Sequence, residues 1–248
     1  MASIPLSASA VNALKIEVRR IYDERKSSHL TEALAVALGF NTHAALLAEL
    51  ESSGADPLYC ILNEEKFDAR MQTLGYPPDP EFFFEDAKTP EMISTDCTHA
   101  YKIHYKTNRQ KAWRNLVVCA VNEALRRRLF SLRPGDNRWP GHDDQHRTSY
   151  LFDFVLPCGL PARVALQDAG LDELSVQVAV NPKGERVSIY DAGLSAGDAY
   201  GSTWIERYRG AWIQSTDDSF RCRRLLIDML AGMKVDPLGY GDRGQLIM

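Results

Sequence analysis

Residue types that commonly bind metals lie close together in Gly141, His142, Asp143, Asp144, Gln145 and His146. His142 and His146 are four residues apart, so they share one face if this segment is helical, and with Asp143 and Asp144 they form a candidate site for a divalent metal. Asp153 is a candidate third ligand, and a metal beside a basic segment indicates phosphodiester hydrolysis. The segment completes no known metal motif, however. The alternative is a solvated polar loop, with Asp153 bonded to a neighbouring strand or an arginine.

Basic residues form a second candidate site. Residues 99–148 contain eleven Lys and Arg against four Asp and Glu, whereas residues 57–98 contain three against nine. A basic stripe of this kind can follow a phosphate backbone. The alternative is a solvated helix face, or pairing with the acidic segment. The candidate nucleic-acid contacts are Arg109, Lys111, Arg114, Arg126, Arg127 and Arg128.

Other catalytic motifs are absent or incomplete. Residues 193–197 have the G-x-S-x-G spacing, but no histidine follows His146, which argues against a Ser–His–Asp hydrolase of that type. The sequence contains neither a Walker A motif nor G-x-G-x-x-G. The five cysteines include no C-x-x-C pair and favour a reducing cytoplasmic compartment. We expect no cofactor apart from the divalent metal already considered.

The basic candidates lie on and around an expected helix from Thr107 to Leu132. Apolar residues recur in it at spacings of three and four, which is typical of an amphipathic helix with one buried face. Thr107 or Asn108 can cap its first turn, and we expect Pro134 and Gly135 to end it.

The first 54 residues predict a compact module of three helices, preceded by a frayed segment of about ten residues. Its central segment is Ser-His-Leu-Thr-Glu-Ala-Leu-Ala (28–35), followed by Leu-Gly-Phe (38–40) and Ala-Leu (45–46). These residues resemble a small N-terminal helical module of bacterial plasmid and integrative-element proteins, some of which carry a glyoxalase-superfamily label. His43 stands where that module commonly has an aromatic residue. The resemblance covers residues 11–50 and implies a mobile-element setting rather than a reaction.

Two close helices also suggest helix-turn-helix DNA binding. The third expected helix, residues 42–50, contains no Arg or Lys, which argues against reading of the major groove. Residues 55–98 predict an acidic helix at 63–74 and then a connector rich in proline and phenylalanine. We expect Phe82, Phe83 and Phe84 to pack against the C-terminal domain, or else to form a partner site.

Residues 99–248 predict the main domain, in which polar and apolar residues alternate with the period of strands. We expect an antiparallel sheet of four to five strands, a loop at 193–203, and a final helix at 218–233 with Arg221, Arg223 and Arg224 on its outer side. The tail after residue 234 has no such periodicity and predicts a loop. The expected strands are 101–105, 150–156, 162–167, 174–180 and one that contains Val187 and Ile189.

Together these patterns predict an α+β protein: a helical N-terminal module (1–54), a connector (55–98) and an α+β domain (99–248) whose sheet packs against two long helices. The sequence contains no apolar segment long enough to cross a bilayer, and no secretory signal. The favoured function is a non-enzymatic, cytoplasmic accessory protein of a bacterial mobile element that binds nucleic acid or a nucleic-acid-handling complex. A metal-dependent nuclease or hydrolase and a protein–protein adaptor are the alternatives.

Overall fold

The computed structural model describes residues 2–94, 105–133, 136, 138–140, 149–187, 193–207, 210–215 and 220–245. The chain forms two compact units. The first comprises Met1–Asp96 and Leu238–Tyr240, and the second comprises Cys97–Pro237 and Gly241–Met248. The connector of residues 55–98 therefore does not stand between two domains, because it is almost wholly part of the first unit.

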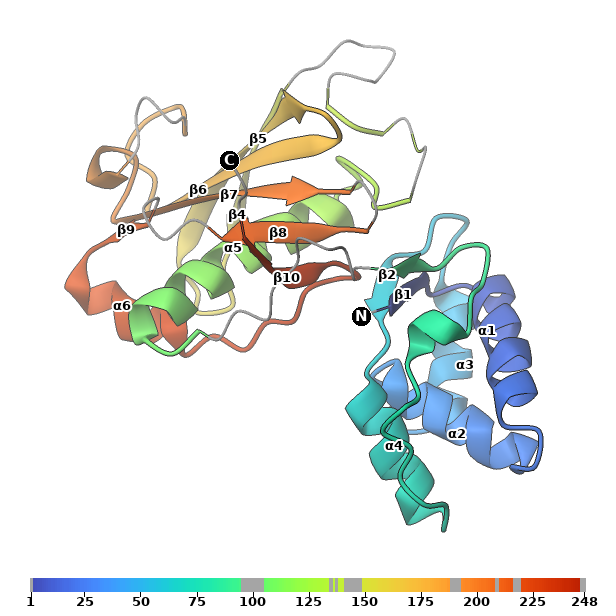
Figure 1. Ribbon diagram of the computed structural model, residues 1–248. Helices are drawn as coiled ribbons and strands as arrows, with labels where there is room; N and C mark the ends of the chain where they lie inside the picture. Colours follow the sequence, from blue (N-terminus) through green and yellow to red (C-terminus); the bar gives the residue numbers. More distant parts are fainter. Residues whose placement is uncertain are drawn as a thin grey trace. The chain divides into compact units, whose positions relative to one another are not determined.

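The first unit combines helices α1 to α4 with a three-stranded antiparallel sheet in the order β2-β1-β3 (Figure 1). Its first strand includes residues that we expected to fray; all four are buried because they lie in the middle of this sheet. The elements are β1 (Ala2–Pro5), α1 (Ala8–Ile21), α2 (Ser27–Ala37), α3 (His43–Ser52), β2 (Tyr59–Ile61), α4 (Glu64–Thr73), the 3-10 turn η1 (Phe84–Asp86) and β3 (Ile93–Ser94).

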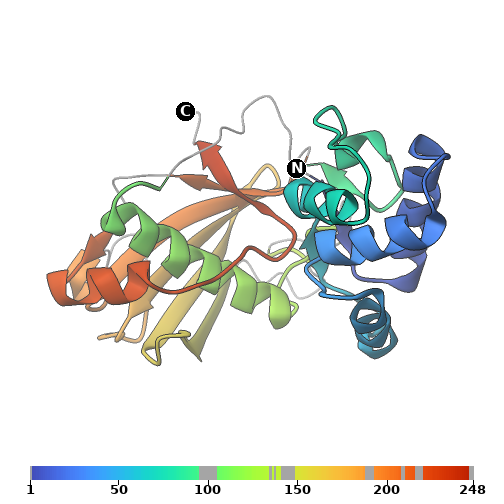
Figure 2. The same cartoon turned by 90° about the horizontal axis from the view of Figure 1, so that it is seen from below.

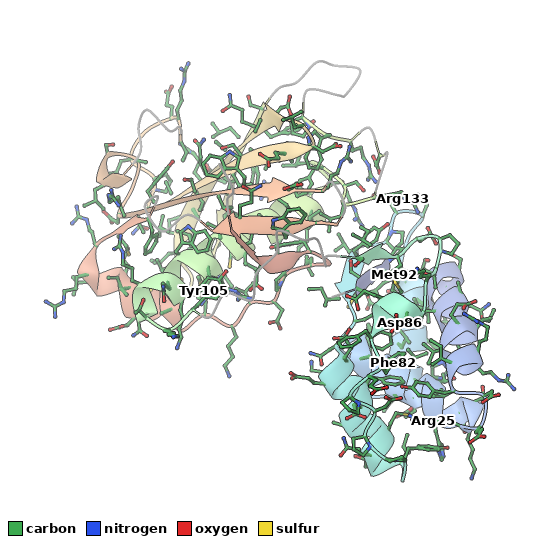
Figure 3. All side chains as sticks on the ribbon, in the orientation of Figure 1. Arg25, Phe82, Asp86, Met92, Tyr105 and Arg133 are labelled. Carbon is green, nitrogen blue, oxygen red and sulfur yellow. The ribbon has the colours of Figure 1, made fainter. Side chains whose placement is uncertain are left out.

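Phe82 and Phe84 of the connector pack inside the first unit, so the expectation that they pack against the C-terminal domain is wrong. Phe82 lies within the first unit (Figure 3), and its ring is 5.3 Å from the Phe67 ring and 5.0 Å from the Phe84 ring. Phe84 is fully buried, whereas Phe83 is 53% exposed. Stacked and edge-on aromatic pairs of this kind stabilise a core beyond the area that they bury.

The second unit is built on one seven-stranded sheet, in the order β10-β8-β7-β6-β5-β4, with β9 paired to β7. Neighbouring strands are antiparallel except for β10 and β8, which are parallel. The elements are α5 (Asn108–Arg126), β4 (Ser149–Val155), β5 (Pro161–Gly170), β6 (Glu173–Val180), the 3-10 turn η3 (Gly193–Ser195), β7 (Ala199–Glu206), β8 (Trp212–Ser215), β9 (Arg221–Cys222), α6 (Arg224–Ala231) and β10 (Gly241–Gln245).

Helix α5 lies across one face of this sheet, with α6 beside it (Figure 2). The Trp113 indole donates to the Ser202 carbonyl oxygen at 3.1 Å, and a Cβ placed on Gly201 lies 3.6 Å from Leu116. Successive side chains of a strand point to opposite faces of the sheet, so the odd-numbered residues of β7, like Gly201, face α5 and the even-numbered residues face away from it. The helix is buried on nearly all sides from Ala112 to Leu125.

The α+β class is confirmed, but the expected sheet of four to five strands is too small. Residues 199–206, which include part of the expected loop, form a central strand, and the expected C-terminal loop contains the edge strand β10. The expected strand at 101–105 lies outside the described residues except for Tyr105, and Val187 is described as non-strand. The sheet is larger than expected because Gly- and Ser-rich segments pair with neighbours that the local sequence does not reveal.

The two helices of this unit are also shorter than expected. Helix α5 ends at Arg126, before the predicted Pro134 stop, and α6 has only 8 residues. Leu225 is 91% exposed and Met229 is 46% exposed. The short helix turns mainly Leu230 inward, so that most of its apolar side chains do not enter the core.

Candidate functional site

The site is organised by the first turn of α5. The Thr107 hydroxyl accepts from the Gln110 N–H at 3.2 Å, and Gln110 Oε1 accepts from the Thr107 N–H at 3.1 Å. This capping box confirms Thr107 as the cap and fixes where the helix begins. It also fixes the direction in which Arg109, in the first turn, leaves the helix.

Two guanidinium groups converge next to this turn. Arg109 and Arg221 both donate to the carbonyl oxygen of Phe220, Arg221 at 3.1 Å. The Arg109 guanidinium carbon also lies 5.1 Å from the centre of the Phe220 ring. Arg109 forms no ion pair with any residue that the structure describes. The Phe220 carbonyl oxygen is a neutral acceptor, so that it does not offset the charge of Arg109.

A surface hollow of about 220 Å³ adjoins this pair of arginines, and Arg109 and Phe220 are among its lining residues. Thr107, Gln110 and Trp113 line the rest. The hollow lies at the N-terminus of a 19-residue helix, where the backbone dipole favours negative charge. Its lining therefore suits an anionic group.

Further basic residues lie close in sequence to the residues that line the hollow, and all of them are exposed. A hydrogen bond of 2.8 Å from Asn108 to Asp228 joins the beginning of α5 to α6. Arg223 forms an ion pair of 2.9 Å with Asp198 and remains 58% exposed. We call this region the Arg109 surface and define it by Lys106, Arg109, Lys111, Arg221, Arg223 and Arg224.

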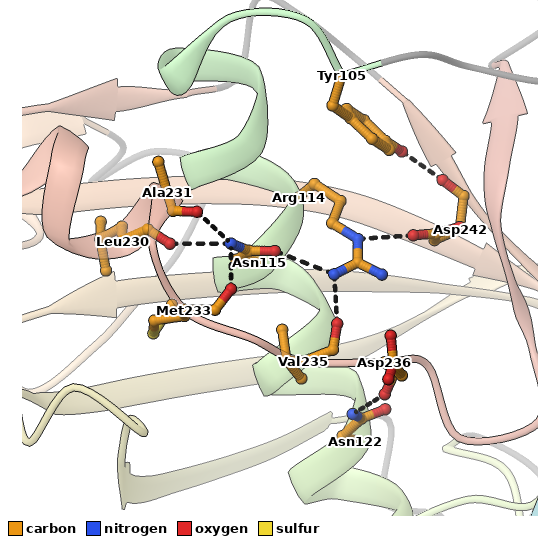
Figure 4. Close-up of polar contacts among 10 residues, drawn as sticks. All are labelled: Tyr105, Arg114, Asn115, Asn122, Leu230, Ala231, Met233, Val235, Asp236 and Asp242. Carbon is orange, nitrogen blue, oxygen red and sulfur yellow. Dashed lines mark hydrogen bonds and ion pairs between the residues drawn. The ribbon is translucent and has the colours of Figure 1, made fainter. Parts of the chain in front are cut away.

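Arg114, another candidate contact, points into the protein instead. Its Nε donates to Asp242 at 2.6 Å, and its Nη1 donates to the Val235 carbonyl oxygen and to Asn115 (Figure 4). The side chain is only 16% exposed. Arg114 is therefore a weaker candidate for a nucleic-acid contact, because the C-terminal segment of the chain accepts hydrogen bonds from its Nε and Nη1.

Arg126, Arg127 and Arg128 lie at the other end of α5, about 25 Å from Arg109 at 1.5 Å per residue. Glu123 pairs with Arg126 at 3.8 Å and with Arg127 at 2.8 Å. Arg127 also donates to the Asp153 carbonyl oxygen at 2.7 Å. These arginines are exposed, but Glu123 offsets part of their charge, so this end is a weaker candidate for binding an anion.

A second hollow, of about 330 Å³, lies near this end of α5. Arg126 and Lys234 contribute positive charge to its lining, and Glu123 and Asp236 contribute negative charge. Opposite charges in similar number give no clear preference for an anion or a cation. We therefore place the candidate site at the Arg109 surface.

The proposed metal ligands His142, Asp143, Asp144 and His146 lie outside the described residues. Asp153 is described, and its carboxylate forms two hydrogen bonds with Arg163, of 2.6 and 2.8 Å. This ion pair lowers the pKa of Asp153 and matches the alternative in which Asp153 bonds to an arginine. Within the described residues, no three His, Cys, Asp or Glu side chains form a metal-binding group.

A pair of carboxylates that we did not predict lies on the face of the sheet away from α5. Glu173 and Glu206 are directly opposite each other on β6 and β7. Gln214 Nε2 donates to Glu173 at 2.8 Å and to Glu206 at 3.4 Å. Burial and the adjacent Glu173 charge raise the pKa of Glu206 from 4.5 to about 7.

This pKa predicts how stability depends on pH. Between pH 4.5 and about 7 the folded state retains a proton on Glu206 that the unfolded state releases, so stability falls as the pH rises through this range. We expect Glu206→Gln to flatten this part of a plot of melting temperature against pH. The measurement is tryptophan-fluorescence melting from pH 4 to 8, with the exposed Glu185→Gln as control. An unchanged profile in Glu206→Gln would contradict the assignment.

We expected Arg221, Arg223 and Arg224 on the outer side of the final helix and did not predict them in the site. Their clustering was visible, but their position beside the first turn of α5 depends on the fold. The carboxylate pair had no local signal at all, since Glu173 and Glu206 are far apart in sequence and become neighbours only through strand register.

No family model, curated protein or solved structure matches this chain. The resemblance of residues 11–50 to a mobile-element module therefore stays a prediction. None of the described helices is long and apolar enough to cross a membrane.

Proposed function

We propose that this protein binds the phosphate backbone of a nucleic acid through the Arg109 surface, as a non-enzymatic accessory protein. The convergence of Arg109 and Arg221 on the Phe220 carbonyl oxygen carries the proposal. A guanidinium has five N–H donors, and Arg109 directs its Nη2 to the carbonyl oxygen of Phe220. The remaining donors suit phosphate oxygens, which arginine binds in pairs.

The surrounding charge supports the same ligand. Lys106, Lys111 and Arg224 are exposed near the beginnings of α5 and α6. A nucleic acid presents phosphates in a row, and several separate cations contact it better than a single pocket does. Arg126, Arg127 and Arg128 can extend this track along α5. The resemblance of the N-terminal module adds a mobile-element setting to the proposal.

The test is fluorescence-anisotropy binding of single- and double-stranded DNA and RNA over a series of salt concentrations. We expect salt-dependent binding by the wild type. For duplex DNA, Arg109→Ala/Arg221→Ala is expected to reduce the slope of log affinity against log salt by about 2, because each lost phosphate contact contributes about 0.9. Arg109→Lys/Arg221→Lys retains both charges and is expected to retain most of the slope.

Two controls separate this surface from the rest of the chain. Arg19→Ala/Arg20→Ala removes two exposed charges from the first unit and is expected to leave binding unchanged. Arg126→Ala/Arg127→Ala/Arg128→Ala tests the other end of α5 and is expected to have the smaller effect. Absence of binding at low salt would refute the proposal. A loss confined to the Arg126 variant would move the site to the other end of the helix.

A further inference from the structure

Helix α6 presents apolar side chains to solvent instead of to the core. Leu225 is 91% exposed and Met229 is 46% exposed, and the two are four positions apart, so they lie on one face of the helix. Leu230 is the only buried residue of α6. Single exposed apolar residues are common on protein surfaces, so the neighbouring groups decide what this pair can bind.

The exposed face of α6 adjoins the Arg109 surface. The Asn108 amide donates to Asp228 at 2.8 Å, so that α6 lies beside the first turn of α5 (Figure 2). Asp228 is three positions after Leu225, and side chains at this spacing are neighbours on a helix. Arg109 follows Asn108 in the same turn and donates to the Phe220 carbonyl oxygen. Leu225 therefore lies close to the turn that directs Arg109.

The residues that precede Leu225 are positively charged. Arg221, Arg223 and Arg224 are all exposed. Asp228 is the only acid of α6, and its carboxylate accepts the hydrogen bond from Asn108. An apolar side chain among cations suits a ligand that is anionic on its surface and apolar inside. A DNA duplex has both properties, because charged phosphates enclose stacked bases.

Two other occupants fit this face less well. An anionic bilayer also combines negative charge with an apolar interior, but binding to it depends on the apolar area that enters, and α6 has two well-exposed apolar side chains. A second copy of the chain needs about 800 Å² on each partner, far more than two side chains provide. A two-fold contact through α6 also brings the arginines of the two copies together, where like charges repel.

We propose that Leu225 and Met229 insert between base pairs of a DNA duplex that is bound at the Arg109 surface, and that the protein thereby kinks the duplex. Leucine and methionine are among the side chains that unstack base steps in this way, from the minor groove. Unstacking costs free energy, which the additional contacts to a bent backbone offset. This inference rests on the proposed function and adds to it a preference for duplexes that bend easily.

The experiment measures bending by energy transfer between dyes at the two ends of a DNA duplex, and affinity by fluorescence anisotropy. A fully paired duplex is compared with one that has a central mismatch, where less stacking is lost. We expect the wild type to bend the duplex by about 20–90° and to bind the mismatched duplex more tightly. Leu225→Ala is expected to lose most of the bending and about tenfold in affinity for the mismatched duplex, because less apolar surface is buried.

The salt dependence separates the apolar contact from the charges. Leu225→Ala removes no charge, so we expect it to leave the slope of log affinity against log salt unchanged, whereas Arg109→Ala/Arg221→Ala reduces that slope. Leu171→Ala is the matched control. Leu171 is 95% exposed in the same unit, but it lies in the connection between β5 and β6. We expect this variant to bind and bend DNA as the wild type does.

The outcomes distinguish this inference from the proposed function. Salt-dependent binding without bending, unchanged in Leu225→Ala, overturns the inference and leaves the proposed function in place. Absence of binding at low salt overturns both. Sedimentation with vesicles of phosphatidylcholine and phosphatidylserine, or formation of a dimer in analytical ultracentrifugation, tests the other occupants. If Leu225→Ala abolishes either one and DNA is not bent, the α6 face belongs to the bilayer or to the second copy, and the inference is wrong.

Discussion

Asn115→Leu is expected to lower the free energy of unfolding of the second unit by about 3 kcal/mol. The Asn115 amide nitrogen donates to the carbonyl oxygens of Leu230, Ala231 and Met233 at 3.0, 3.1 and 2.9 Å (Figure 4). Its own oxygen accepts from Arg114 at 3.0 Å. Leucine has a similar shape but no donor, so that the chain following α6 loses its buried attachment to α5.

Urea unfolding followed by tryptophan fluorescence measures this effect, because all four tryptophans of the chain lie in the second unit. Asn108→Ala is the matched control. It removes an asparagine from the same helix, whose hydrogen bond to Asp228 is exposed. We expect Asn108→Ala to lower the free energy of unfolding by less than about 1 kcal/mol. Equal losses in both variants would show that the Asn115 contacts do not stabilise the unit in the expected way.

Gly239→Ala is expected to destabilise the first unit by about 3 kcal/mol, through backbone strain and overlap combined. Gly239 has φ +78, and a Cβ at this position would lie 2.1 Å from Cβ of Tyr59. The segment Leu238–Tyr240 belongs to the first unit, although the residues on either side of it belong to the second. Ser3 holds it through a hydrogen bond of 2.8 Å to the Gly239 carbonyl oxygen.

Hydrogen exchange measured by mass spectrometry locates this effect, and we expect faster exchange in peptides that cover β1 and β2. Gly75→Ala is the control, since Gly75 has φ +93 but no atom within 4 Å of the added Cβ. Gly75→Ala therefore measures only the free energy of placing alanine at a positive φ, which is about 1 kcal/mol. If Gly239→Ala behaves like Gly75→Ala, the close contact with Tyr59 is relieved by a small shift and carries little energy.

The first turn of α5 was predictable because its signals are local. The apolar spacing and the Thr107 cap are properties of adjacent residues, and both are confirmed. The end of the helix was not predictable. Arg128 adopts φ 58, a conformation that usually requires glycine, and Leu129 donates back to the Ala124 carbonyl oxygen at 3.1 Å. Phe130 and Leu132, which follow this turn, are buried, and no nearby residue indicates the turn.

The strands likewise include some that the local sequence predicts and one that it does not. β5 and β6 have clear alternation and lie where the sequence predicted them. β7 begins Ala-Tyr-Gly-Ser, a composition typical of loops, yet it pairs with β6 along its whole length. A Cβ at Gly201 would lie 3.6 Å from Trp113, Leu116 and Phe220, which is ordinary van der Waals contact, so this glycine lies in the core and not in a loop.

The amino-acid sequence alone was enough to predict the class of the fold, the start of the central helix and the location of the basic residues along the chain. It could not determine which of those charges are available, because a charge is neutralised by neighbours in space. Arg109 and Arg114 lie on the same helix, but the tertiary structure directs Arg109 to a neutral carbonyl and Arg114 to the Asp242 carboxylate. The sheet register likewise placed Glu173 opposite Glu206. Electrostatic interactions depend on distance and burial, and for residues far apart in sequence only the folded chain sets either one.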